Sequence, residues 1–248
     1  MLQFLKVKGF TSAPEFHGCF TDTEAVKHDS DFYKGKYFSW ETGKGSKKCI
    51  VMDYIPRKDL QERLAEEGVS MAKKIVLLSK LFDLLERFHA TNVVHQDLKL
   101  ENIKLNERDE LVLFDFANSY EISEGQFNGG GTLEYVAPEL TSTPPMASSQ
   151  KSDVYAMSVL MMGLVFDGLP VNPSHRANIT LLKDIRKTEL EITTPNEEFG
   201  FLDNKTTSED KFYNLLSQMM DANPDKRPSA FHAKRDWLEI LAGQELSE

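Results

Sequence analysis

Two acidic residues, a lysine and an asparagine in the middle of the chain have the types and spacing that phosphoryl transfer requires. Asp97, Lys99 and Asn102 share one polar stretch behind an apolar pair, and Asp115 follows a second apolar run of strand-like character. In this chemistry one carboxylate accepts the proton of the incoming hydroxyl, a lysine neutralises the phosphate, and an amide and a second carboxylate hold Mg²⁺. We therefore expect Asp97 and Lys99 to be catalytic and Asn102 and Asp115 to bind the metal.

These residues lie in motifs that resemble the signature motifs of eukaryotic-type protein kinases. Residues 95–102, with the sequence His-Gln-Asp-Leu-Lys-Leu-Glu-Asn, are similar to the H-R-D-x-x-x-x-N catalytic loop of that family, and residues 115–117, Asp-Phe-Ala, are similar to its D-F-G magnesium motif. Residues 131–139, Gly-Thr-Leu-Glu-Tyr-Val-Ala-Pro-Glu, resemble the segment that ends in A-P-E. The three motifs occur in the family's order and at its distances, so the resemblance is specific.

The resemblance implies a two-lobed α+β kinase fold. Residues 1–55 would form a reduced, β-rich N-lobe with the hinge, and residues 56–248 would form a larger, mainly helical C-lobe with the catalytic loop and the activation segment. The family's glycine-rich loop would precede Lys6, so either the small lobe is reduced by nature or the sequence lacks its true N-terminus. Gly43 and Gly45 predict a hairpin turn and not a phosphate-binding loop, because no helix follows them.

The resemblance also implies a binding site for ATP. Lys6 belongs to a strand-like run over residues 1–7 and resembles the phosphate-binding lysine of the V-A-I-K strand, the alternative being a solvated edge lysine. Glu24, in a helix-compatible stretch over residues 13–28, would pair with Lys6, and Glu15 competes for that role. The hinge that meets adenine would consist of Met52, Asp53, Tyr54 and Ile55.

Departures from the family pattern leave an alternative to an active enzyme. Ala117 replaces the glycine of D-F-G, and Lys104 stands beneath adenine, where the family usually has an apolar residue. Like the missing glycine-rich loop, each should weaken nucleotide binding. The alternative is a pseudokinase, a kinase-shaped scaffold that binds partners. A small-molecule kinase of related fold is a third interpretation, but the A-P-E segment and an expected structural pair of Glu139 with Arg227 favour a protein kinase.

The resemblance further implies ATP and Mg²⁺ as cofactors and serine or threonine of a protein as the phosphoryl acceptor. Lys99, two residues after the base, and Thr132, near A-P-E, follow the family's Ser/Thr pattern. Gln96 stands where many relatives have an arginine that binds activation-loop phosphate, and a neutral amide cannot form that bidentate ion pair. We therefore expect the protein to be active as made, without phosphorylation of its activation loop. The sequence predicts neither a particular regulatory partner nor an oligomeric state.

The sequence also predicts the elements that position these residues. Asp153 is expected either to cap its helix or to brace the catalytic loop by accepting backbone hydrogen bonds, and a glycine-rich stretch over residues 125–131 lies where an activation loop belongs. Strands are predicted over residues 32–40, 48–55, 103–105 and 111–114. Helices are predicted over residues 59–67, closed by Gly68, and over residues 70–89, 152–166, 179–187 and 209–221.

Composition places the chain among ordinary globular proteins. Its 248 residues are 40% hydrophobic and 27% charged, and no apolar run approaches the roughly 20 residues that a membrane-spanning helix needs. No signal peptide is evident, and Cys19 and Cys49 offer at most one disulfide and no metal cluster, so we expect a reducing, cytoplasmic location, with secretion into a host cell as the alternative. The net charge of -10 argues against nucleic acid and is compatible with a basic peptide substrate.

Overall fold

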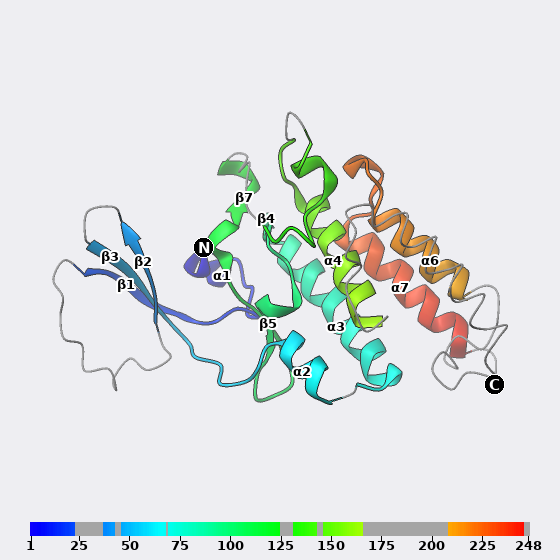
Figure 1. The fold of residues 1–248 in the computed structure, drawn as a ribbon, viewed down its shortest axis with the longest axis horizontal. Coiled ribbons are helices and arrows are strands. Elements are labelled where there is room, and N and C mark those ends of the chain that lie inside the picture. The colour runs from blue at the N-terminus through cyan, green and yellow to red at the C-terminus, as the bar shows by residue number, and fades with distance from the viewer. Residues whose placement is uncertain are drawn as a thin grey trace.

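A small antiparallel sheet lies at one end of the molecule and a body of helices at the other (Figure 1). The computed structural model describes residues 1–22, 37–42, 46–67, 69–124, 131–142, 146–165 and 208–245. The sheet contains three strands in the order β1-β3-β2, where the strands are β1 (Phe16–Asp22), β3 (Ser46–Met52) and β2 (Tyr37–Thr42). Such an arrangement of small sheet and helical body agrees with the predicted α+β class.

The first element is a helix, so the strand predicted over residues 1–7 is wrong. In α1 (Leu2–Val7) the amide of Leu5 donates to the carbonyl of Met1 at 2.9 Å, and the Leu5 side chain is fully buried. A short apolar run does not distinguish a strand from a helix by its periodicity, and here tertiary burial of Leu5 decides. Hydrogen bonding between Leu113 N and Ser12 O, at 2.8 Å, then ties this N-terminal region to the body.

The next prediction, a helix over residues 13–28, is also wrong in its described part. Phe16 begins strand β1, which pairs with β3 in a register from Phe16 opposite Met52 to Asp22 opposite Lys47, so cross-strand pairing outweighs the helix-compatible pattern. Strand β2 overlaps the last residues of the strand predicted over residues 32–40 and continues beyond them. Strand β3 begins and ends earlier in the chain than the strand predicted over residues 48–55. Residues 23–36, with Glu24, and the turn glycines Gly43 and Gly45 lie outside the described residues.

Helices form the body, and the most buried of them is α4 (Gln150–Val165). Nearly all of its side chains are buried, as predicted, and it contacts α3 (Met71–His89) and α6 (Ser208–Met219). The remaining helices are α2 (Leu60–Glu67) and α7 (Ala230–Glu245). Gly68, the glycine-rich residues 125–130 and the predicted helix over residues 179–187 are not among the described residues. Within the described ranges, no helix combines the length and apolar character needed to cross a membrane.

Helix α7 is absent from the sequence-based prediction. It packs on α3 and α6, and its Trp237 side chain is 1% exposed. The indole Nε1 donates to Ser79 Oγ at 2.9 Å, and the indole stacks on Phe82 with ring centroids 5.7 Å apart. Trp237 therefore joins the C-terminal helix to the centre of α3.

Two short antiparallel pairs connect the helices to the polar residues of interest. Strand β5 (Ile103–Leu105) pairs with β6 (Leu111–Leu113), at the positions of the strands predicted over residues 103–105 and 111–114, and β4 (Val93–Val94) pairs with β7 (Tyr120–Glu121). Short 3₁₀ helices lie at Leu100–Asn102, Phe116–Asn118, Ile122–Glu124, Pro138–Leu140 and Pro224–Lys226.

The predicted ion pair of Glu139 with Arg227 is present and buried. Arg227 donates from Nη1 to Glu139 Oε1 at 2.8 Å and from Nη2 to Oε2 at 2.6 Å, and the two residues are only 2% and 4% exposed. The guanidinium also donates to the carbonyls of Asp221 and Lys151 and lies 4.9 Å from the centroid of the Tyr155 ring. This pair joins the segment before α4 to the turn before α7.

Replacing Arg227 by Met should destabilise the fold strongly, because it leaves the Glu139 carboxylate buried without its partner. A buried pair broken on one side costs about 3 to 5 kcal/mol. For a chain of this size we expect the melting temperature to fall by roughly 6 to 20 °C. Arg235→Gln is the control, since it breaks exposed pairs to Asp236 and Glu239 and should leave the melting temperature close to that of the wild type. Equal melting temperatures for the two variants would contradict this account.

Candidate active site

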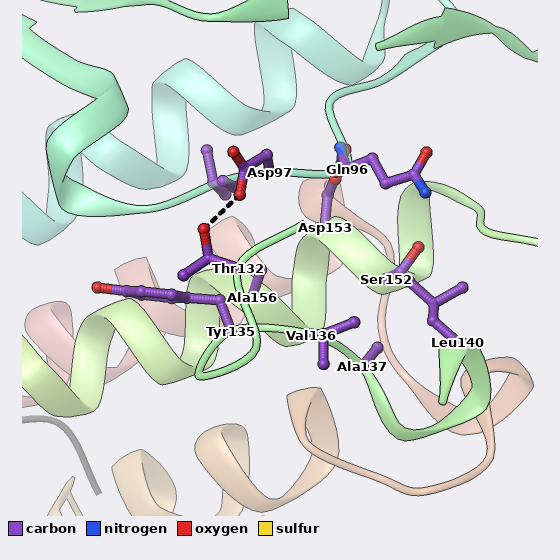
Figure 2. Close-up of a pocket in the computed structure, with 11 residues that line it drawn as sticks. Gln96, Asp97, Thr132, Tyr135, Val136, Ala137, Leu140, Ser152, Asp153 and Ala156 are labelled. Atoms are coloured by element: carbon purple, nitrogen blue, oxygen red, sulfur yellow. Dashed lines mark hydrogen bonds between the residues drawn. The ribbon is translucent and has the colours of Figure 1, made fainter. Parts of the chain in front are cut away.

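The catalytic loop, residues 95–102, lies between strands β4 and β5, and its central acid is held by two neighbours. Thr132 Oγ1 donates to Asp97 Oδ1 at 2.8 Å, the contact drawn in Figure 2. Lys99 Nζ donates to the same threonine oxygen at 2.7 Å and lies 3.6 Å from Asp97 Oδ2. Asp97 is 8% exposed. A carboxylate, an ammonium and a hydroxyl thus converge on one point, which brings the predicted catalytic residues Asp97 and Lys99 together.

Thr132 is the site residue that the sequence-based assignment left out. It comes within reach of Asp97 because Gly131 has a φ of +100°, a conformation that favours glycine. A Cβ at residue 131 would lie 2.8 Å from the carbonyl oxygen of Gln96, too close for any side chain. In the sequence, Thr132 was indicated only by the Gly-Thr pair before the A-P-E segment. That pair pointed to the type of phosphoryl acceptor and not to a contact between Thr132 and Asp97.

Asp153 braces the catalytic loop, as one of the two alternatives predicted. Its carboxylate accepts hydrogen bonds from the backbone amides of His95 and Gln96, both at 2.8 Å, and lies 3.1 Å from His89 Nε2. Helix α4 begins at Gln150, so Asp153 lies inside the first turn and not at the capping position. These bonds fix the loop where Gln96 has a strained φ of 68°.

His95 connects the loop to the strand that carries Asp115. Burial lowers the pKa of His95, which favours the neutral ring. With one proton on Nε2, the ring donates to the carbonyl of Phe114 at 3.0 Å, and Nδ1 accepts from the Asp97 amide at 3.3 Å. Both ring nitrogens are therefore used to place the two acids relative to each other.

Asn102 and Asp115, the predicted magnesium ligands, lie at the same end of the β5–β6 hairpin. The Asn102 amide nitrogen donates to the carbonyl of Asp97 at 2.8 Å, so its amide oxygen is the atom left to coordinate a cation. Asp115 is exposed and has left-handed backbone angles, and within the described residues its carboxylate accepts one long hydrogen bond, from Ala117 N at 3.4 Å. The amide of Phe114 donates to the carbonyl of Asn102 at 2.8 Å, which ties the two together. One carboxylate and one amide suit Mg²⁺, which takes its other ligands from phosphate and water.

Lys6 does not have the surroundings that its assignment requires. It lies on α1 and not on a strand, it is exposed, and its ammonium pairs with Glu15, the alternative to Glu24. Glu24 itself lies outside the described residues. The interpretation of Lys6 as a strand-borne phosphate ligand is therefore without structural support, and the alternative of a solvated lysine agrees with its 62% side-chain exposure.

The predicted hinge residues directly follow the sheet. Met52 ends β3, and the amide of Asp53 donates to the carbonyl of Glu15 at 3.0 Å. Tyr54 is 57% exposed. Further along, the backbone of Asp59 forms an isolated bridge with Lys104, so Lys104 lies beside the chain that leaves the hinge.

A pocket lies between the catalytic loop, the segment after Gly131 and helix α4 (Figure 2). Its lining includes Asp97 and Thr132 from the site and Asp153 and Ala156 from α4. The hydroxyl of Thr132 points toward Asp97 in this view. The pocket therefore places open space directly next to the side chain predicted to be the base.

Comparison of the sequence with known proteins shows which family the chain belongs to. The model of the protein kinase domain matches residues 36–238, a range that includes Asp97, Lys99, Asn102, Lys104 and Asp115 and begins after Lys6 and Glu24. The chain is 27% identical over 208 residues to 3-phosphoinositide-dependent protein kinase B of Dictyostelium discoideum, covering 77% of this chain and 21% of that protein.

Two further relatives are similar at the same level. The phosphorylase b kinase gamma catalytic chain, liver/testis isoform, of Mus musculus is 28% identical over 193 residues, which cover 74% of this chain and 45% of that one. Ribosomal protein S6 kinase 2 alpha of Xenopus laevis is 28% identical over 185 residues, which cover 73% of this chain and 23% of that protein. The chain thus spans less than half the length of these relatives. Because the family model matches most of its residues, the chain belongs to the protein kinase domain family, with the two-lobed fold of that family.

Proposed function

We propose that this chain is a protein kinase that transfers the γ-phosphoryl group of Mg·ATP to a serine or threonine of a protein substrate. The observation that carries the proposal is the convergence of Asp97, Lys99 and Thr132, with Asn102 bonded to the same aspartate. All the groups that phosphoryl transfer requires of the C-lobe are present.

In this proposal Asp97 accepts the proton of the acceptor hydroxyl while that oxygen bonds to the γ-phosphorus and the bond to the bridging oxygen of ADP breaks. Lys99, 3.6 Å from Asp97, neutralises charge on the phosphoryl group in transfer. Mg²⁺, when bound, would be held by Asn102 and Asp115 and would neutralise the phosphates. The Ser/Thr preference is supported by Lys99 and Thr132, which contact each other and the base.

A binding scaffold without catalysis is the second candidate function. It is favoured by the position of Lys6 on an exposed helix and by Ala117 in place of the motif glycine. The two candidates differ in what they require of nucleotide: only the enzyme must bind ATP together with magnesium. Nucleotide binding and phosphoryl transfer therefore separate them.

Asp97→Asn should abolish phosphoryl transfer and preserve the fold, because it removes the base without changing the size of the side chain. General bases contribute about 10² to 10⁴ in rate. Transfer of labelled phosphate to a mixture of serine- and threonine-containing peptides measures the loss, and a melting curve checks the fold. Asp210→Asn, at an exposed position of α6, is the matched control and should keep full activity. Near-wild-type transfer by Asp97→Asn would refute the assignment.

Mg·ATP should raise the melting temperature, and Asp115→Asn should remove the part of this shift that depends on magnesium. A ligand at a hundredfold excess over its Kd stabilises the native state by about 2.7 kcal/mol. That corresponds to a shift on the order of 5 to 10 °C for a chain of this size. The titration extends to millimolar ATP, with and without Mg²⁺. If the wild type shows no magnesium-dependent shift at saturating ATP, the scaffold function replaces the enzyme.

Phosphatase treatment should leave the activity unchanged. Three hydroxyls near the site are already used: Ser119 bonds to His95 O at 3.1 Å, Tyr120 to Ser148 O at 2.6 Å and Thr132 to Asp97. Phosphate on any of them would displace these bonds, and Gln96 carries no charge to bind it. Activity measured before and after treatment, with mass spectrometry to count phosphates, checks this. A preparation that is active when phosphorylated and silent afterwards would show that the interpretation of Gln96 is wrong.

A further inference from the structure

Lys104 lies on the β5–β6 hairpin, two residues after the proposed magnesium ligand Asn102. Lys104 is opposite Val112 in the register, and the bond from Phe114 N to Asn102 O extends the ladder by one more opposed pair. Side chains alternate between the two faces of a strand, so Lys104 lies on the face of β5 opposite to that of Ile103, which is fully buried, and Asn102 ends the 3₁₀ helix directly before β5. The lysine and the metal ligand are therefore close neighbours at the end of the hairpin that carries Asp115.

The ammonium of Lys104 leans toward the metal end of the hairpin. Its Nζ lies 5.6 Å from the centroid of the Phe114 ring, within the range of a cation–π contact. Phe114 is opposite Asn102 and directly precedes Asp115. Because the ammonium of Lys104 reaches this ring, the side chain extends toward the end of the hairpin where Asn102 and Asp115 lie. The contact with Phe114 also limits the positions that the ammonium can take.

Lys104 also differs from the other lysines considered for the site. Lys99 is engaged with Asp97 and Thr132, and Lys6 is engaged with Glu15. By contrast, Lys104 is half-buried and forms no ion pair with a carboxylate in the part of the chain that the structure describes. Lysine is rarely buried without a partner, so a half-buried ammonium directed toward a proposed metal site is suited to an anionic ligand.

We propose that Lys104 binds the phosphate groups of the nucleotide, next to the magnesium held by Asn102 and Asp115. The inference rests on the proposed function and reverses the expectation from sequence that Lys104 weakens ATP binding. It gives Lys104 the charge-neutralising role for which Lys6 is unsuited by its place on α1. The ligand class is a nucleoside di- or triphosphate, because an ammonium forms its strongest, charge-assisted hydrogen bonds with anionic oxygens such as those of phosphate.

The test compares nucleotide affinities of Lys104→Met, which keeps most of the length of the side chain and loses the charge, with those of Lys104→Arg, which keeps the charge. Calorimetric titration with ATP, ADP and adenosine, each with Mg²⁺, gives the dissociation constants. A charge-assisted hydrogen bond corresponds to about ten- to hundredfold in affinity. We expect Lys104→Met to lose this much for ATP and ADP and to bind adenosine as well as the wild type, with Lys104→Arg close to wild type. Lys226→Met removes the same charge from an exposed position and is the control.

The outcomes separate this inference from the proposed function. If the wild type binds Mg·ATP and Lys104→Met binds it equally well or more tightly, Lys104 is not a phosphate ligand, and the proposed function stands. Equal losses for ATP and adenosine would also overturn the inference, because they would show a general defect of the site. If the wild type binds no nucleotide, the proposed function fails and this inference fails with it. Melting curves without ligand confirm that each variant is folded.

Discussion

The carboxylate of Asp153 is the group on which the rest of the site depends. It is 1% exposed and accepts from two consecutive backbone amides, those of His95 and Gln96, while His89 lies against it from the end of α3. Burying a carboxylate is unfavourable unless hydrogen bonds replace its hydration, and here three donors do so. The catalytic loop is consequently fixed to the most buried helix of the body. The position of the loop is therefore set by a buried contact with α4 and not by contacts at the surface.

The backbone of the site is strained where the chemistry is proposed. Gln96 and Asp115 both have positive φ, at 68° and 57°, and neither is glycine. Such conformations cost on the order of 1 to 3 kcal/mol each and persist only where neighbours hold them. The His95 ring, which bonds to Phe114 O and to the amide of Asp97, lies between the two strained residues. Neighbouring hydrogen bonds thus stabilise the strained loop, and local sequence preference does not.

Sequence alone was sufficient for several main elements of the C-lobe and insufficient for the first residues. The long helix α3, the buried helix α4 and the pair of Glu139 with Arg227 were predicted, because their patterns are long or their partners are specific. Residues 1–7 were too short for periodicity to decide, and α1 forms because Leu5 is buried. Helix α7 was missed although Trp237 could have indicated it. The contact of Thr132 with Asp97 could not be foreseen, because it depends on a backbone turn that brings distant segments together.

The close approach of Gly131 to the catalytic loop has a consequence for exchanging parts between kinases. The carbonyl of Gln96 occupies the space that any Cβ at residue 131 would need. The segment that begins at Gly131 and the catalytic loop therefore contact each other through main-chain atoms. Substituting the side chains around them does not remove this contact. A chimera that received the segment after Gly131 from another kinase would have to keep a residue without a Cβ at the junction, whatever the donor. Glycine at residue 131 is therefore a condition that any exchange of this segment has to meet.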